Sequence, residues 1–309
     1  MKVLFYLSGV SPNSPFPFSR WLVDIQPKIK EDRVHRFDLT VPSLQPNRSK
    51  TEVPVRLYVP TVYSSVYGKL PVLVWMHGGG FVFGSVKDRL NDNFAHTLAN
   101  ELGSYVLAVE YSLAPENKFP DALEDCYSVL HYLNSGDADW IYGRGEFSEL
   151  YPMNLRNVFV GGVSAGGNLA ISSKLLWRDR QISMQKSDSI SFHPHHHQYE
   201  YSNIHILGEV LVTPDFMRNQ RDETFNMDRY ILDGEQVEKM RNMYLRDDVC
   251  LEEQKNHLYI SILSNLDKKF NLETFIYSYK SSVYFEENRD MAENLRNKNI
   301  NIRTTFRVN

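Results

Sequence analysis

The chain has 309 residues, enough for one large domain or two small ones with a substantial buried core. Its 34 basic and 38 acidic side chains are interspersed and give a net charge of −4, so nucleic acid is not expected as a partner. Two cysteines, Cys126 and Cys250, form no disulfide framework or zinc site and favour a reducing, cytoplasmic location. No apolar stretch is long enough to span a membrane, and residues 3–7 are too few for the core of a cleaved signal peptide.

The N-terminal part of the chain predicts an irregular segment followed by two paired strands. Prolines punctuate residues 11–20, so we expect residues 1–32 to form an arm or small cap. Residues 33–41 and 53–59 alternate apolar and polar side chains, as strands with one solvated face do. Two such strands in succession predict an antiparallel pair.

From residue 70 onward, apolar runs alternate with helical stretches, which predicts βαβ units, a mostly parallel sheet and an α/β fold. The expected strands are residues 72–76, 105–109, 158–160, 206–212, 274–278 and a final edge strand at 300–308. The expected helices are residues 87–101, 121–134, 165–177, 234–245 and 286–295. Residues 179–204 are polar and rich in Ser and His, so we expect a surface insertion within a domain that covers residues 33–309.

A serine lies in a glycine-rich turn between an expected strand and an expected helix. The segment Gly-Val-Ser-Ala-Gly occupies residues 162–166 and matches the pattern Gly-x-Ser-x-Gly, directly after the strand at 158–160. Small neighbours let the strand and helix approach closely, and the positive end of the helix favours an oxyanion. We therefore expect Ser164 to be a nucleophile.

A second glycine run follows the strand at 72–76. Residues 77–81 read His-Gly-Gly-Gly-Phe, and glycines allow backbone N–H groups to face a substrate carbonyl without obstruction. We expect Gly78, Gly79 and Ala165 to supply the donors of an oxyanion hole. His77 precedes the serine by far in the sequence, and we expect it to order this loop and not to act as a general base.

A third block, Tyr-Ser-Leu-Ala-Pro-Glu at residues 111–116, follows the strand at 105–109. In order and spacing the three blocks resemble the hormone-sensitive-lipase-like family of α/β-hydrolases, which includes bacterial esterases, arylacetamide-deacetylase-like enzymes and plant carboxylesterases. The resemblance is strong over residues 50–178 and weak over residues 205–308. Two positions depart from the family blocks, since Ser112 stands for Arg and Val163 for Asp.

The resemblance implies an α/β-hydrolase fold, a mostly parallel twisted sheet with helices on both faces and a small N-terminal cap. It also implies a serine hydrolase of carboxylic esters that acts through Ser164 on a small-molecule ester and needs no cofactor or metal. The family's catalytic Asp aligns with Ser282, or with Ser281 after a shift of one residue, and neither can hold an imidazolium by charge. Glu286 or Glu287 could substitute, although glutamates at a helix start are usually partners of the helix dipole.

The family histidine follows the last strand, and the sequence in hand ends at Asn309, within or just after that strand. The other histidines predict no triad base: four of them, His193, His195, His196 and His197, lie in the expected insertion. His96, His131 and His257 lie in helical or loop contexts. The chain is therefore expected to be an ester hydrolase by fold and motif. The alternatives are a non-catalytic ligand-binding, receptor-like protein and an inactive truncated member of the family.

Overall fold

The computed structural model describes most of the region from residue 34 to residue 307. The described residues are 34–45, 51–61, 69–135, 152–188, 203–217, 234–248, 253, 257–262, 273–279, 282–298 and 302–307. The expected N-terminal arm (residues 1–32) lies outside them, as do residues 189–202 of the expected insertion.

One eight-stranded sheet organises the molecule, with the strand order β1-β2-β4-β3-β5-β6-β7-β8. Strand β2 runs antiparallel to both β1 and β4, and the neighbouring strands from β4 to β8 pair in parallel. The strands are β1 (Val34–Pro42), β2 (Glu52–Pro60), β3 (Leu70–Met76), β4 (Tyr105–Val109), β5 (Met153–Val163), β6 (Ile206–Val212), β7 (Glu273–Tyr279) and β8 (Ile302–Arg307). This confirms the predicted antiparallel opening pair and the predicted parallel sheet.

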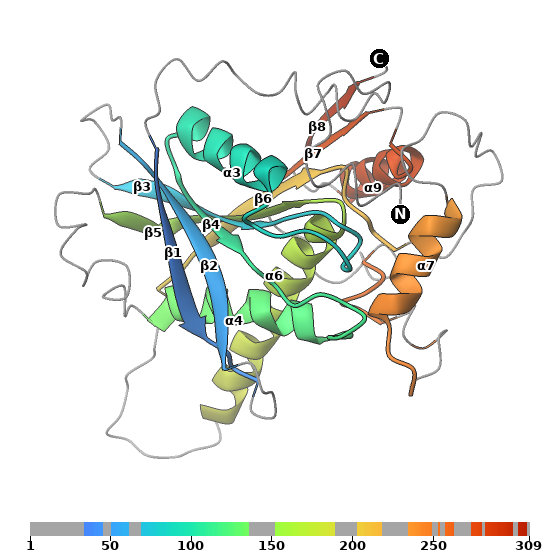
Figure 1. Ribbon diagram of the computed structural model, residues 1–309, viewed down its shortest axis with the longest axis horizontal. Coiled ribbons are helices and arrows are strands. Elements are labelled where there is room, and N and C mark those ends of the chain that lie inside the picture. The colour runs from blue at the N-terminus through green and yellow to red at the C-terminus, as the bar shows by residue number, and fades with distance from the viewer. Residues whose placement is uncertain are drawn as a thin grey trace.

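Helices cover both faces of the sheet. On one face lie α4 (Asp121–Ser135) and α6 (Ala165–Asp188), with α9 (Phe285–Asn297) beside β7 and β8. Helix α3 (Arg89–Leu102) packs on the opposite face, as Figure 1 shows, and α7 (Gly234–Tyr244) packs through Met240 on the loop after β3. This arrangement confirms the predicted α/β-hydrolase architecture. None of the helices in the described ranges is long and apolar enough to cross a membrane.

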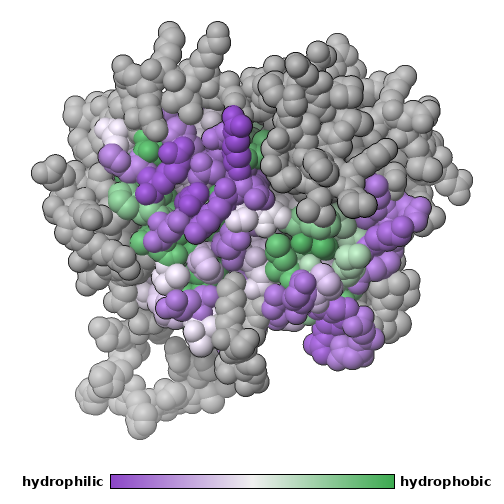
Figure 2. Space-filling view, viewed as in Figure 1, coloured by the Kyte–Doolittle hydropathy of each residue, from purple (hydrophilic) through white to green (hydrophobic). Residues whose placement is uncertain are grey.

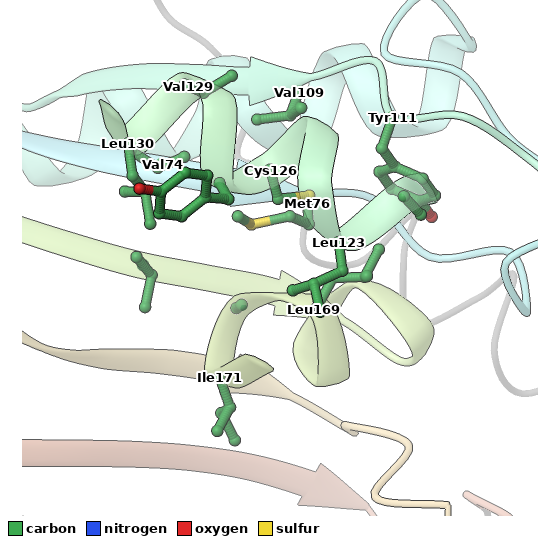
Figure 3. Close-up of a cluster of buried hydrophobic side chains, with 14 of the residues drawn as sticks. Val74, Met76, Val109, Tyr111, Leu123, Cys126, Val129, Leu130, Leu169 and Ile171 are labelled. Atoms are coloured by element: carbon green, nitrogen blue, oxygen red, sulfur yellow. The ribbon is translucent and has the colours of Figure 1, made fainter. Parts of the chain in front are cut away.

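The two faces of the central strands bury different side chains. On β3, Val74 and Met76 contact the residues of α4 and α6, whereas Trp75 packs toward α3. Figure 3 shows the first of these clusters, in which Met76 of β3, Cys126 of α4 and Leu169 of α6 come together. Burial on both faces explains why these strands read as continuous apolar runs in the sequence.

Helix α6 is longer than the sequence predicts. It was expected to end at residue 177 and to give way to a surface insertion at residue 179, but it continues to Asp188. The added turns are polar, yet they have specific partners: Arg180 pairs with Glu124 of α4 and its guanidinium lies 4.1 Å from the ring centroid of Tyr127. Asp179 accepts a hydrogen bond from the hydroxyl of Tyr259 at 2.8 Å. These tertiary contacts hold a polar segment in the helix that composition alone assigns to a loop.

Candidate active site

Ser164 is the single residue that joins β5 to α6. Its φ of +54° lies in the left-handed region, a costly conformation for a residue with a side chain. Its N–H donates to the carbonyl oxygen of Val212 at 3.0 Å, and its own carbonyl oxygen accepts from the N–H groups of Gly167 at 2.9 Å and Asp215 at 3.0 Å. The backbone of Ser164 is therefore fixed by these three hydrogen bonds, one to α6 and two to the end of β6 and the residues after it. Its partly exposed side chain lies at the N-terminal end of α6.

The glycines around Ser164 are needed because backbone segments touch there. A Cβ on Gly162 would overlap the carbonyl oxygen of Gly166, and a Cβ on Gly166 would overlap the carbonyl oxygens of Met76 and His77. The strand-to-helix turn is thus pressed against the end of β3. This contact brings the serine next to the glycine run that follows β3.

The loop after β3 is built on an unusual backbone. Gly79, Gly80 and Phe81 have positive φ angles of 131°, 61° and 65°, and the carbonyl oxygen of Gly79 accepts hydrogen bonds from Val82 N at 3.1 Å and Phe83 N at 2.9 Å. A Cβ added at Gly78 would lie 3.6 Å from the Cβ of Ser164. The first glycine of the run therefore packs directly against the serine.

The three expected oxyanion donors gather at this contact. Gly78 and Gly79 lie in the loop and Ala165 directly follows Ser164. Among the described residues, their N–H groups donate to no side chain and to no carbonyl outside the regular helices and strands. Such donors, at the positive end of a helix, can stabilise negative charge on a carbonyl oxygen.

His77 is part of the loop framework. Its ring is buried and stacks on Tyr111 with centroids 4.3 Å apart, and its Nδ1 lies 2.7 Å from the carbonyl oxygen of Gly78. The hydroxyl of Tyr111 donates to the carbonyl oxygen of His77 at 2.8 Å. Burial lowers the pKa of His77, so the ring is neutral at pH 7. These contacts direct the imidazole toward its own loop.

Helix α7 lies over the glycine loop. The Met240 thioether packs so closely on Gly80 that an added Cβ there would overlap it, and the Tyr244 ring stacks on Phe81 with centroids 4.1 Å apart. An apolar cluster forms where the two meet, and its members are Val82, Phe83, Val237, Met240, Val283 and Tyr284. Figure 2 shows a hydrophobic area beside the hydrophilic surface of α7. The surroundings of the glycine loop are therefore suited to an apolar group.

The expected acid position lies in the turn between β7 and α9. Ser282 is buried, and its Oγ accepts a hydrogen bond from the N–H of Tyr284 at 3.2 Å, so the hydroxyl closes a local turn. Ser281 lies outside the described residues. Glu286 pairs with Arg289 on its own helix, and Glu287 Oε2 lies 4.0 Å from Arg241.

A buried polar cluster that the sequence did not reveal lies beside Ser164. Asp215, just after β6, is 1% exposed, and its carboxylate pairs with the Arg241 guanidinium from α7 through Nη2 and, at 3.3 Å, through Nε. The Tyr284 hydroxyl donates to Asp215 Oδ2 at 3.2 Å. Of the three residues, only Asp215 could have been suspected from the sequence. It is an acidic residue at the carboxyl end of an expected parallel strand, where ligand-binding and catalytic residues often lie.

The histidines within the described ranges lie elsewhere. His96 is buried in α3, His131 lies on α4 beside Tyr132, and His257 contacts the edge of Phe119. In the part of the chain that the structure describes, no histidine is hydrogen-bonded to Ser164. The four histidines at positions 193 and 195–197 lie outside the described residues.

Comparison with known proteins finds plant enzymes among the relatives of this chain. Carboxylesterase 20 of Arabidopsis thaliana is 33% identical over 156 residues, which cover 50% of this chain and 40% of the relative. Tuliposide A-converting enzyme 2, chloroplastic, of Tulipa gesneriana is 32% identical over 165 residues, which cover 48% of this chain and 41% of the relative. The matches thus span less than half the length of these two relatives.

Proteins of known structure share this fold, and a family profile matches most of the chain. The hyperthermophilic esterase from the archaeon Pyrobaculum calidifontis superimposes with a TM-score of 0.65, at 23% identity, over 88% of this chain and 75% of that one. The profile of the alpha/beta hydrolase fold matches residues 73–307, from within β3 to the end of β8. Because that match includes both the glycine run and the serine turn, the chain belongs to the alpha/beta hydrolase fold family.

Proposed function

We propose that this chain hydrolyses carboxylic esters through Ser164. The observation that carries the proposal is the contact between the serine turn and the glycine loop, in which Gly78 packs against Ser164 at the start of α6. The names of the relatives, a carboxylesterase among them, support the same chemistry. No other function is favoured by a feature of the site.

In the proposed reaction, the Oγ of Ser164 bonds to the ester carbonyl carbon and gives its proton to a water molecule. The carbonyl oxygen becomes an oxyanion that the N–H groups of Gly78, Gly79 and Ala165 receive. As the tetrahedral intermediate collapses, the carbon–oxygen bond to the alcohol breaks and the alcohol leaves with a proton taken from water. A second water molecule then attacks the acyl-serine, which releases the carboxylic acid and returns a proton to Ser164 Oγ. We propose Ser282 as a structural residue at the position of the family acid, because its hydroxyl closes a turn.

The substrate is proposed to be an ester with a small or medium acyl group. The apolar cluster that includes Phe83, Val237 and Met240 lies next to the glycine loop and suits such a group. With no histidine hydrogen-bonded to Ser164 in the described part of the chain, we expect slow turnover. Loss of the base in a serine triad costs roughly a millionfold, and the oxyanion hole retains a residual acceleration of about a thousandfold over water.

Turnover of p-nitrophenyl acetate and p-nitrophenyl butyrate tests the proposal. We expect a slow release of p-nitrophenol that disappears in Ser164→Ala, with unchanged thermal unfolding in that variant. Equal rates in the two proteins would contradict the proposal, because hydrolysis would then not pass through Ser164. Saturable binding of the ester without any turnover would favour a receptor-like protein instead.

A cytoplasmic location is also proposed. It is supported by the low cysteine count of the sequence. Fractionation of cells that express the tagged full-length protein would test this location. Recovery in an organelle would overturn it, and the tulip relative that is described as chloroplastic makes that outcome worth measuring.

A further inference from the structure

The glycine loop has a costly backbone that its neighbours must maintain. Gly79, Gly80 and Phe81 all have positive φ angles, and such a conformation persists only where surrounding contacts over-determine it. Met240 of α7 packs on Gly80. Tyr244, on the same face of α7 one turn later, stacks on the buried Phe81 ring with the two rings inclined by 11°. The placement of α7 therefore determines the shape of this part of the loop.

The position of α7 is specified by a directional contact next to Met240. Apolar packing is non-directional and does not by itself fix the register of a helix. Arg241 directs its Nη2 at Asp215 Oδ1 and its Nε at Asp215 Oδ2, the latter at 3.3 Å, so the guanidinium engages both oxygens of one carboxylate. Such a fork fixes orientation as well as distance. The Arg241 side chain is 14% exposed and that of Asp215 is 2% exposed, so salt screens the pair little.

Asp215 is itself fixed against the serine turn. Its backbone N–H donates to the carbonyl oxygen of Ser164 at 3.0 Å, and its Oδ1 accepts from Met217 N at 2.9 Å. The Tyr284 hydroxyl donates to its Oδ2 at 3.2 Å. The carboxylate that receives Arg241 therefore has a fixed position relative to the backbone of the expected nucleophile.

We propose that the ion pair between Asp215 and Arg241 holds the glycine loop in register with Ser164 by fixing α7. This role rests on the proposed ester hydrolysis, in which the N–H donors of the loop must face the carbonyl attacked by the serine. Gly78 meets the serine turn directly, whereas the residues after Gly79 are supported from α7. Arg241 is a positioning residue, because it acts through α7 on the loop that carries the donors.

Two substitutions at Arg241 separate positioning from stability. Arg241→Met leaves Asp215 without this ion partner, so we expect a lower urea midpoint of unfolding. Arg241→Lys keeps the charge but replaces the fork with a single point contact, so most of the midpoint should return. We expect kcat for p-nitrophenyl butyrate to fall about 100-fold in Arg241→Met and to remain about 10-fold low in Arg241→Lys, because a misplacement of about 1 Å is that costly. The rate of Ser164 phosphonylation by a fluorophosphonate, followed by intact mass, should fall in parallel.

Hydrogen exchange reports on the loop without any substrate. The amides of Val82 and Phe83 donate to the carbonyl oxygen of Gly79 at 3.1 and 2.9 Å, so they are protected while the loop keeps its shape. We expect the peptide that covers residues 77–84 to exchange about 10-fold faster in Arg241→Lys than in the wild type, because the loop opens locally more often when α7 is less firmly fixed.

Arg180 provides the matched control. Its guanidinium pairs with Glu124 of α4, and it lies on α6 several helical turns beyond Ser164. Arg180→Met and Arg180→Lys make the same chemical changes to another arginine–carboxylate pair. We expect Arg180→Met to lower the urea midpoint, and both variants to keep the wild-type reaction rates and the wild-type exchange of residues 77–84.

The outcomes separate this role from the proposed function. A wild-type reaction rate, or wild-type exchange of residues 77–84, in the Arg241 variants would overturn the role, while turnover that depends on Ser164 would leave ester hydrolysis standing. Full recovery of both rate and midpoint in Arg241→Lys would also overturn it, because the pair would then act through charge alone.

A wild-type chain that neither turns over ester nor is phosphonylated would overturn the ester-hydrolase proposal. Loop exchange would then still decide whether Arg241 holds the glycine loop. Should Arg241→Met not fold, Arg241→Lys and its Arg180→Lys control carry the comparison.

Discussion

Gly78 packs directly against Ser164: a Cβ added to the glycine would lie 3.6 Å from the Cβ of the serine and 3.2 Å from the carbonyl oxygen of Val163. The two residues come from loops after β3 and β5, which are neighbouring parallel strands. Because parallel strands end at the same edge of a sheet, the loops that follow them meet there. The relative position of these two loops therefore decides whether backbone N–H groups can reach a carbonyl attacked by Ser164.

Gly79→Ala should separate the loop from the serine. Gly79 has a φ of +131°, and a Cβ there would overlap the backbone carbonyl oxygen of Phe83. The loop must move to relieve this overlap, so the oxyanion donors lose their position. Loss of a single donor costs about 3 kcal/mol of transition-state stabilisation, so we expect kcat/KM for p-nitrophenyl butyrate to fall about 100-fold.

Gly103→Ala provides the control for backbone strain. Gly103 also has a positive φ, +57°, at the end of α3, but an added Cβ would meet nothing within 4 Å. Both variants should lose stability in thermal unfolding, roughly 1–2 kcal/mol for the strain alone at Gly103. Only Gly79→Ala should lose activity, and equal activity in the two variants would show that the loop does not position the donors.

The sheet was predictable because burial on both faces of a parallel strand leaves a continuous apolar run in the sequence. The expected strands at 105–109 and 206–212 coincide with β4 and β6. The prediction was less accurate where polar residues join a regular element. Strand β5 begins at Met153 and not at residue 158, because Met153 pairs with Leu70 although polar residues follow it. Local composition does not show which residues pair with a neighbouring strand.

The candidate site was likewise predictable from the sequence only in part. The serine turn and the glycine loop are contiguous motifs, so a few neighbouring residues revealed them. Tyr284, Asp215 and Arg241 come from three segments that only tertiary structure assembles. Nothing in the local sequence distinguishes Arg241 from a solvated arginine on a helix. The number of residues between the members of this cluster depends on the topology of the whole sheet. Their separation in the sequence therefore does not reveal that they lie together.

A second buried ion pair, between Lys174 of α6 and Glu209 of β6, should matter for stability and not for chemistry. The two side chains are 7% and 0% exposed, and Thr274 Oγ1 donates to Glu209 Oε2 at 2.6 Å. Removing one member leaves a buried charge without its ion partner. We therefore expect Lys174→Met to lower the free energy of unfolding by about 3–5 kcal/mol in urea titrations.

The double variant Lys174→Met with Glu209→Gln tests whether the pair acts as a unit. The double variant has no unpaired buried charge at either position. Its loss of stability should therefore be smaller than the sum of the losses in the two single variants by roughly 0.5–3 kcal/mol. Additive losses would show that the two side chains stabilise the fold independently. Ser164 labelling by a fluorophosphonate should be unaffected in the folded fraction of each variant.

The neutral state of His77 should make the fold sensitive to acid. Burial lowers the pKa of His77 below its usual value of about 6.5, whereas in the unfolded chain the ring titrates near that value. As pH falls below about 6.5 the unfolded state therefore binds more protons than the folded state, and the free energy of unfolding decreases. Above that pH both states hold a neutral ring and the effect vanishes.

Urea titrations between pH 8 and pH 5 on the wild type and His77→Asn would measure this contribution. The asparagine amide retains a donor for the carbonyl oxygen of Gly78, which His77 Nδ1 contacts at 2.7 Å, but cannot gain a proton. We expect the wild type to be more stable at pH 8, and its advantage over His77→Asn to shrink as pH falls below about 6.5. A constant difference between the two proteins across this range would mean that the His77 ring does not resist protonation. Because the ring contacts Gly78, which packs on Ser164, the same acidification should also weaken esterase activity before the protein unfolds.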